Sequence, residues 1–333
     1  MTAQNDKTPD PWMNLGTDLH PVFLNPASLL VSRLLIQANS GGGKSVTIQR
    51  LLIEALKTNI PFWVIDPEGE FSEFLDNSVR KSGVVVVSPA KKKRTLCLET
   101  LSPDCVDTPE ELAPHLLECK TKSFIFDLSE FKSLQEKRDF VSGLLTGLNE
   151  SPESFWKKLL VIIDEAHVFA PERSDKNSNP CKASVSCLMS TGRKRGFCGV
   201  LATQRLGKLA KDCVAECNNV LIGRTVLDID VARACDTLGF STKKDDKEKF
   251  KNLVPGEFFC FGPSFRNFCG GGAALFGLIK IKEPTWKDRH VVVLLEGNSN
   301  NNKNQQQQKN GIIELFLRSK PVTYIREYFR KCL

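Results

Sequence analysis

The chain has 333 residues, of which 41% are hydrophobic and 26% are charged, and its formal net charge is +7. This composition is ordinary for a soluble globular protein, and no run of about 18 or more uncharged apolar residues occurs, so no membrane span is predicted. Residues 1–20 lack the basic and apolar regions of a secretory signal, so we expect a cytoplasmic protein. The excess of positive charge mildly favours a polyanionic partner.

Residues 1–25 are predicted to form a small irregular arm, and the segments that follow alternate between strand-like and helical patterns. Several strand-like runs are continuously apolar, as in parallel strands that helices cover on both faces. This rhythm predicts an α/β fold with a mostly parallel sheet. The expected strands are residues 34–38, 62–66, 84–87, 124–128, 159–164, 199–203 and 220–224, and the expected helices include residues 45–57, 109–118, 131–148 and 228–238.

The C-terminal third is less regular. Apolar runs within residues 257–282 suggest a closing hairpin or edge strands, so we place the end of the core domain near residue 290 and its start at residue 26. Residues 291–310 are rich in Asn and Gln and are predicted to be a linker, because such a segment buries little apolar surface. Residues 311–333 are predicted to form a short helical tail.

A glycine-rich segment follows the first predicted strand of the core and precedes the helix predicted at residues 45–57. Glycines let successive backbone N–H groups face phosphate oxygens, and the helix N-terminus that follows favours anions. Lys44 supplies a charge for the β and γ phosphates, and the Ser45 hydroxyl is positioned to ligate Mg²⁺. The usual phosphate-loop motif begins with glycine where this chain has Ala38, which can make the turn if its φ stays negative. The residues expected to bind the nucleotide are Asn39, Ser40, Gly41, Gly42, Gly43, Lys44 and Ser45.

Two adjacent carboxylates end the apolar strand predicted at residues 159–164, in a segment that resembles a Walker B motif. Asp164 would hold Mg²⁺, usually through water, and Glu165 would orient the attacking water or accept its proton. An acidic pair at a strand end is often only a solvated turn. Its combination with a phosphate loop favours the metal and water roles instead.

Polar side chains also end the strand predicted at residues 199–203. Gln204 follows it and is predicted to sense the γ-phosphate or position water, because an amide can donate and accept together. A hydrogen bond from Gln204 to a neighbouring loop is the alternative.

The basic cluster at residues 192–196 has three possible roles. Arg193 could reach the γ-phosphate of a neighbouring subunit, which can raise turnover by roughly 10³ to 10⁵. The cluster could instead contact nucleic-acid phosphates, or it could be a solvated turn.

Acidic residues near a glycine turn end the strand predicted at residues 62–66. Because the carboxyl ends of parallel strands gather around one crevice, Asp66 and Glu68 could lie near the nucleotide. A helix N-cap role for Asp66 is equally open, since Asp is a favoured cap.

Taken in order, these five segments resemble the HerA/FtsK superfamily of P-loop motors, and specifically the HerA-like ATPases. The segments are residues 39–45, 65–70, 164–167, 192–196 and 202–205. The resemblance covers roughly residues 20–285 and implies a RecA-like ATPase domain that binds ATP and Mg²⁺. Carried onto this sequence, it makes Lys44 and Ser45 nucleotide and Mg²⁺ ligands, Asp164 and Glu165 the Walker B pair, Gln204 the sensor and Arg193 the intersubunit arginine.

The resemblance also implies a homohexameric ring that pumps double-stranded DNA and acts with a nuclease or defence effector. Two alternatives stay open at this point. One is an ATPase that energises conjugation or secretion, and the other is an ATP-binding scaffold with little turnover.

Overall fold

A computed structural model describes residues 12–17, 21–71, 83–89, 100–101, 108–118, 123–241, 243–267 and 275–285. The linker predicted at residues 291–310 and the helical tail predicted at residues 311–333 lie outside these described residues. Within them, no helix is both long and apolar enough to cross a membrane.

The centre of the molecule is a ten-stranded sheet in the order β13-β11-β10-β3-β9-β8-β4-β7-β5-β6. From β10 to β6 all neighbouring strands are parallel, whereas β11 and β13 add to the β10 edge in antiparallel fashion. The strands are β3 (Leu34–Gln37), β4 (Phe62–Asp66), β5 (Val84–Val87), β6 (Thr100–Leu101), β7 (Ser123–Asp127), β8 (Leu159–Ile163), β9 (Phe197–Thr203), β10 (Asn219–Ile222), β11 (Glu257–Gly262) and β13 (Leu275–Lys280). All seven strands expected within residues 34–224 are therefore confirmed, as are the edge strands expected within residues 257–282.

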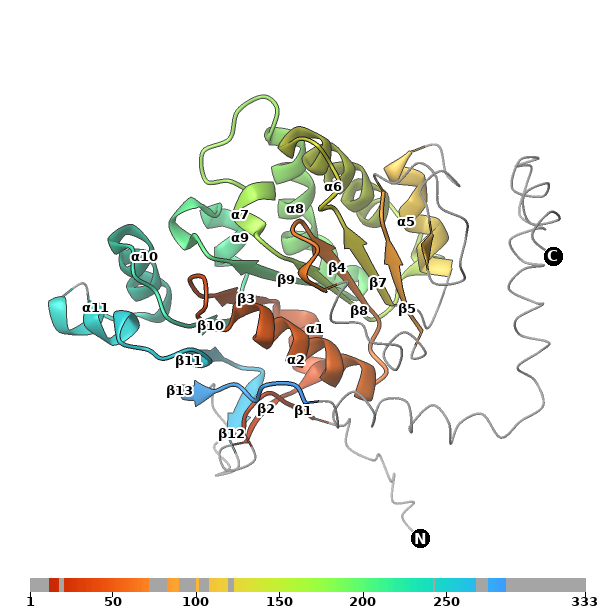
Figure 1. Cartoon of the computed structure of the whole chain (residues 1–333). Helices are drawn as coiled ribbons and strands as arrows, with labels where there is room; N and C mark the ends of the chain where they lie inside the picture. The colour runs from red at the N-terminus through yellow and green to blue at the C-terminus, as the bar shows by residue number, and fades with distance from the viewer. Residues whose placement is uncertain are drawn as a thin grey trace, which may run out of the picture.

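Helices cover both faces of this sheet (Figure 1). The α-helices are α1 (Pro26–Ser32), α2 (Lys44–Lys57), α5 (Pro109–Glu118), α6 (Leu134–Asn149), α7 (Ala166–Phe169), α8 (Asn179–Thr191), α9 (Lys211–Ala215), α10 (Asp228–Leu238) and α11 (Lys244–Lys251), and the 3-10 turns are η2 (Glu153–Phe155), η3 (Gly192–Arg195) and η4 (Leu206–Lys208). Helices α1 and α2 pack on one face, whereas α5, α6 and α8 pack on the other. Strand β3 shows how one strand serves both layers, because Leu35 faces the α6 side and Leu34 and Ile36 face the α2 side.

Helices α1, α7, α9 and α11 were not among those predicted, and two longer helices, α6 and α8, show why the prediction and the structure differ. Helix α6 was expected to begin at Phe131, but it begins at Leu134 because Ser133 and Glu136 form a capping box at its N-terminus. Helix α8 was not among the predicted helices. It carries several Ser and Cys residues, which blur its apolar face, although Val185 and Leu188 are fully buried.

The irregular arm expected over residues 1–25 is not irregular where the structure describes it. Strands β1 (Met13–Asn14) and β2 (Val22–Leu24) form a small three-stranded antiparallel sheet with β12 (Phe265–Asn267). The physical reason is that Met13 and Leu15 are fully buried beside α2, where Arg50 Nε donates to the Asn14 carbonyl at 2.9 Å. These strands are too short for an alternation of apolar and polar residues to be recognised in the sequence.

Candidate nucleotide-binding site

The glycine-rich segment forms the loop between β3 and α2. Gly41 and Gly43 have φ angles of 70° and 101°, which lie in the left-handed region that favours glycine. Gly43 is the N-cap of α2, so the backbone N–H groups of the first turn of this 14-residue helix are available to an anion. The loop therefore has the geometry that phosphate binding requires.

Ala38 occupies the position where the usual motif has glycine, and its φ is not positive, as the sequence analysis required. Its side chain is fully buried against the loop. A Cβ added to Gly42 would lie only 2.9 Å from the Ala38 Cβ, and one added to Gly223 would lie 3.0 Å from it. Alanine fits because both facing residues are glycines.

Asn39 fixes the position of the phosphate loop through two hydrogen bonds. Its Oδ1 accepts a hydrogen bond from the Val226 backbone N–H at 3.0 Å, while the Asn39 backbone N–H donates to the Arg224 carbonyl at 2.9 Å. Asn39 therefore ties the phosphate loop to the segment that follows β10.

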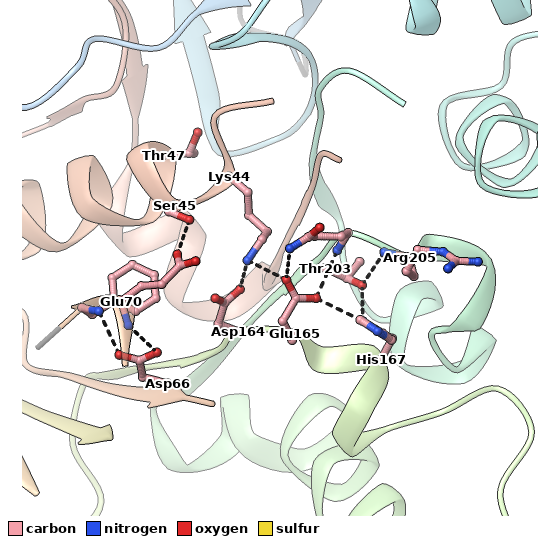
Figure 2. A network of polar contacts seen from close by, with 12 residues as sticks. Lys44, Ser45, Thr47, Asp66, Glu70, Asp164, Glu165, His167, Thr203 and Arg205 are labelled. Atoms are coloured by element: carbon pink, nitrogen blue, oxygen red, sulfur yellow. Dashed lines mark hydrogen bonds and ion pairs between the residues drawn. The ribbon is translucent and has the colours of Figure 1, made fainter. Parts of the chain in front are cut away.

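Lys44 and the two acids of the β8 end are in direct contact (Figure 2). The Lys44 ammonium donates to Asp164 and lies 3.0 Å from Oε1 of Glu165, and all three side chains are at most 10% exposed. Burial alone would lower the pKa of Lys44, but the charges of Asp164 and Glu165 outweigh it and raise this pKa. Burial raises the pKa of Asp164, and the Lys44 charge opposes that rise.

Glu165 is the most connected carboxylate of the site. Gln204 Nε2 donates to its Oε1 at 2.6 Å, and His167 Nδ1 lies 3.3 Å from its Oε2. Although burial acts in the opposite direction, these contacts together with Lys44 lower the pKa of Glu165 to about 2. The residue has a φ of 45°, an uncommon left-handed conformation for a non-glycine residue. The structure thus brings Lys44, Asp164, Glu165 and Gln204 together.

His167 and Thr203 extend this network toward α10. The His167 Nδ1 and the Thr203 hydroxyl are 3.0 Å apart, and that hydroxyl accepts the Arg205 N–H at 3.0 Å. The Arg205 side chain in turn pairs with the fully buried Asp230 at 3.1 Å. A chain of polar contacts therefore connects the Glu165 carboxylate to the first turn of α10, and the sequence analysis assigned no role to His167 or Asp230.

The acids after β4 have separate positions. The Asp66 carboxylate is fully buried and accepts the N–H groups of Gly69 and Phe71, each at 2.8 Å, so it holds the turn that follows β4. Burial, the largest effect, raises the pKa of Asp66 to about 6. Glu68 is exposed.

Glu70, which the sequence analysis did not single out, approaches the phosphate loop instead. Its Oε2 accepts the Ser45 hydroxyl at 2.6 Å (Figure 2).

Arg193 is not brought to this site within its own chain. It lies on the exposed turn η3, which precedes β9, whereas Gln204 follows the carboxyl end of β9. The six residue steps of the strand separate the two ends by about 20 Å. Any action of Arg193 on a nucleotide would therefore require a neighbouring subunit.

A cavity of about 520 Å³ opens over the phosphate loop. This volume falls in the range of roughly 300–1,000 Å³ that is usual for small-molecule sites. Its lining residues are Asn39, Ser40, Gly41, Gly43, Lys44, Ser45, Val46, Glu70, Gln204, Pro255, Gly256, Lys280, Ile281 and Glu283.

Two oxygen donors suit Mg²⁺: Ser45 lines this cavity, and Asp164 contacts Lys44, which also lines it. The Ser45 hydroxyl and the Asp164 carboxylate are oxygen ligands, which Mg²⁺ prefers. In the part of the chain that the structure describes, no group of three His, Cys, Asp or Glu side chains could hold a metal. Mg²⁺ is usually held by one or two carboxylates together with substrate phosphates, so Asp164 and Ser45 are the side chains that would hold it here.

Comparison with known proteins agrees with this geometry. Residues 14–106 match the family model described as the central domain of the helicase HerA. Over 140 residues the chain is 27% identical to the DNA double-strand break repair helicase HerA of Pyrococcus furiosus. In these segments the chain resembles HerA. The matched segment is 41% of this chain and only 24% of that relative, so the likeness spans about a quarter of the HerA protein.

Solved structures share the fold of this HerA-like chain. VirB4 of Thermoanaerobacter pseudethanolicus superimposes with a TM-score of 0.58 at 14% identity, covering 85% of this chain and 99% of VirB4. The bacterial conjugative coupling protein TrwBdeltaN70 gives a TM-score of 0.57 at 11% identity, covering 83% of this chain and 90% of that protein. The predicted RecA-like α/β fold is confirmed.

Proposed function

We propose that this chain is an ATP-hydrolysing motor, a DNA translocase of the HerA type that works as a hexamer. The observation that carries the proposal is the direct contact of Glu165 with both Lys44 of the phosphate loop and Gln204 of the neighbouring strand end. The phosphate ligand Lys44 and the candidate sensor Gln204 thus both contact the carboxylate of the candidate base, Glu165. This combination supports hydrolysis rather than nucleotide binding alone.

Each of these groups has a distinct task in the proposed reaction. Ser45 and Asp164 would hold Mg²⁺, which neutralises charge on the phosphate oxygens. Lys44 would turn from the acids toward the β and γ phosphates. Glu165, having lost that cation, would become more basic and orient the attacking water, with Gln204 beside it.

The DNA and assembly parts of the proposal have separate support. The HerA relative from Pyrococcus furiosus is described as a DNA double-strand break repair helicase, and the net charge of +7 of this chain suits a polyanion. The exposed Arg193 would complete the active site of the adjacent subunit, which makes a closed ring necessary for turnover. A nuclease or other effector would use the resulting motion.

The decisive experiment measures phosphate release by the purified full chain with and without double-stranded DNA, alongside its mass with ATP present. We expect a hexamer whose ATP hydrolysis rises with DNA and is lost in Glu165→Gln, while ADP binding persists. Equal, near-zero turnover in the wild type and in Glu165→Gln would overturn the motor and favour an ATP-binding scaffold. An ATP hydrolysis rate that does not change when DNA is added would contradict the proposal of a DNA translocase.

A further inference from the structure

We propose that the turn at residues 255–256 and the strand end at residues 280–283 bind the nucleoside half of the nucleotide. This inference rests on the proposed function and adds a second subsite to the same cavity. The phosphate loop forms one wall of the cavity, and Pro255, Gly256, Lys280, Ile281 and Glu283 form another. Since the loop and Lys44 engage phosphates, the sugar and base must extend along a different wall.

The second wall is attached to the phosphate loop by the backbone. The Gly256 N–H donates to the Gly42 carbonyl at 3.0 Å, and the Ile281 N–H donates to the Gly256 carbonyl at 2.9 Å. The contact between the two glycine turns is so close that a Cβ on Gly43 would lie 2.9 Å from the Gly256 nitrogen. The two walls are therefore held in one fixed geometry, which lowers the ordering cost of binding a ligand across both.

The side chains of this wall have the chemistry that a nucleoside needs. Lys280 Nζ donates to the Pro255 carbonyl at 2.5 Å, and an ammonium has three N–H groups, so two can serve oxygen atoms of a ligand. The exposed Glu283 carboxylate is an acceptor for sugar hydroxyls or for an amine on the base. Ile281, only 4% exposed, offers apolar surface next to them.

Charge also separates the two ends of the cavity. Of the residues that line it, Lys44 and Lys280 are the cations, and Lys44 is paired with Asp164 and Glu165. Lys280 and Glu283 lie on the β13 side, away from these acids, and bring opposite charges to the same wall. A neutral, polar group such as ribose fits this pair better than a further phosphate does.

The test compares ADP with inorganic pyrophosphate by titration calorimetry on the full chain with Mg²⁺. Glu283→Ala and Lys280→Ala should each weaken ADP binding about tenfold, as expected for the loss of one hydrogen bond to a charged group, and leave pyrophosphate binding unchanged. Lys282→Ala is the matched control, because Lys282 is on the same strand end but does not line the cavity, and it should change neither.

The possible failures are distinguishable. An unchanged ADP affinity in Glu283→Ala, or an equal loss of ADP and pyrophosphate affinity, would overturn the nucleoside subsite. If Lys280→Ala unfolds the turn, Glu283→Gln and Glu283→Ala still decide the question from an exposed position. If wild-type chain binds neither ADP nor pyrophosphate, the proposed nucleotide site itself is wrong.

Discussion

Lys44 Nζ lies 3.0 Å from the Oε1 of Glu165, so the phosphate loop and the end of β8 are joined through a buried ion pair. The Lys44 ammonium cannot keep its present contacts with both acids and also bind a phosphate. Nucleotide binding must therefore loosen this contact, and the affinity of the site depends on how firmly Glu165 holds the lysine.

Glu165→Gln removes one of the two negative charges that hold Lys44. We expect turnover to fall by about 10² to 10⁴, because the water loses its base, while ATP affinity stays equal or rises by up to about tenfold. Phosphate release and equilibrium ATP binding measure the two effects. Glu172→Gln, which changes an acid that pairs with Lys211 away from the cavity, is the control. Weaker ATP binding in Glu165→Gln would show that the Lys44 contact does not compete with phosphate.

Glu70 should oppose nucleotide binding when Mg²⁺ is absent, because its carboxylate holds the Ser45 hydroxyl at 2.6 Å beside the phosphate loop. Removing its charge with Glu70→Gln should tighten Mg²⁺-free ADP binding about three- to tenfold, as expected for one partly screened charge. Calorimetry in the presence of a chelator measures this. Glu68→Gln, an exposed acid on the same turn, should leave the affinity unchanged.

Gly43 and Gly41 provide a matched pair for the contact between the phosphate loop and the turn at residues 255–256. Both have positive φ, but a Cβ at Gly41 would meet nothing within 4 Å, whereas one at Gly43 would lie 2.9 Å from the Gly256 nitrogen. Gly41→Ala should cost about 1–2 kcal/mol of unfolding free energy from backbone strain alone. Gly43→Ala should cost about 1–3 kcal/mol more, because the backbone must shift. Denaturant unfolding without nucleotide measures both, and equal losses would contradict the close contact.

Asp66 should make stability fall as pH rises through the mildly acidic range. Its pKa is raised from 3.8 to about 6 in the folded chain, so the folded state binds more protons than the unfolded state between these values. The unfolding free energy of the wild type should therefore decrease by up to about 3 kcal/mol between about pH 4 and pH 6 relative to Asp66→Asn. Urea unfolding across this range measures the difference. A parallel pH profile in the two proteins would show that Asp66 does not titrate there, and Glu68→Gln controls for a change in net charge.

Arg193 should act only between subunits. Arg193→Ala should lower turnover by about 10³ or more without changing ADP affinity, whereas Lys194→Ala, which changes its exposed neighbour, should have little effect. Mixing Arg193→Ala subunits with Glu165→Gln subunits should restore part of the activity, because some sites then combine an intact arginine with an intact glutamate. A mixture that stays inactive while forming mixed rings would exclude Arg193 from this role.

Local patterns predicted the scaffold of this site well. The strand β4 ends at Asp66 as expected, because the run of four apolar residues before it contains no breaker and has few alternatives once helices cover both faces. The glycine-rich turn between β3 and α2 was also predicted, because its glycines and the start of the helix are neighbours in the chain. The start of α6 differs by three residues from the prediction because the Ser133 capping box sets it, whereas its end differs by one residue.

Contacts between distant segments could not be predicted in this way. The pairing of Ser45 with Glu70, 25 residues away, depends on where the turn after β4 brings a side chain. The packing of Gly43 on Gly256 depends on the order of strands in the sheet, because β11 joins β10 beside β3. A hairpin was expected in the right place, but nothing in its own residues indicated that it borders the phosphate loop.

The small sheet near the N-terminus limits how far this protein can be truncated from that end. The Leu15 carbonyl accepts the Lys282 N–H at 2.9 Å, and Gly16 bridges to Ile281, so the residues that follow β1 hold in place the strand end that borders the cavity. A shortened chain starting at Val22 would retain each sequence motif discussed above and still lose this clasp. We expect such a truncated chain to bind nucleotide more weakly although all of its sequence motifs are intact.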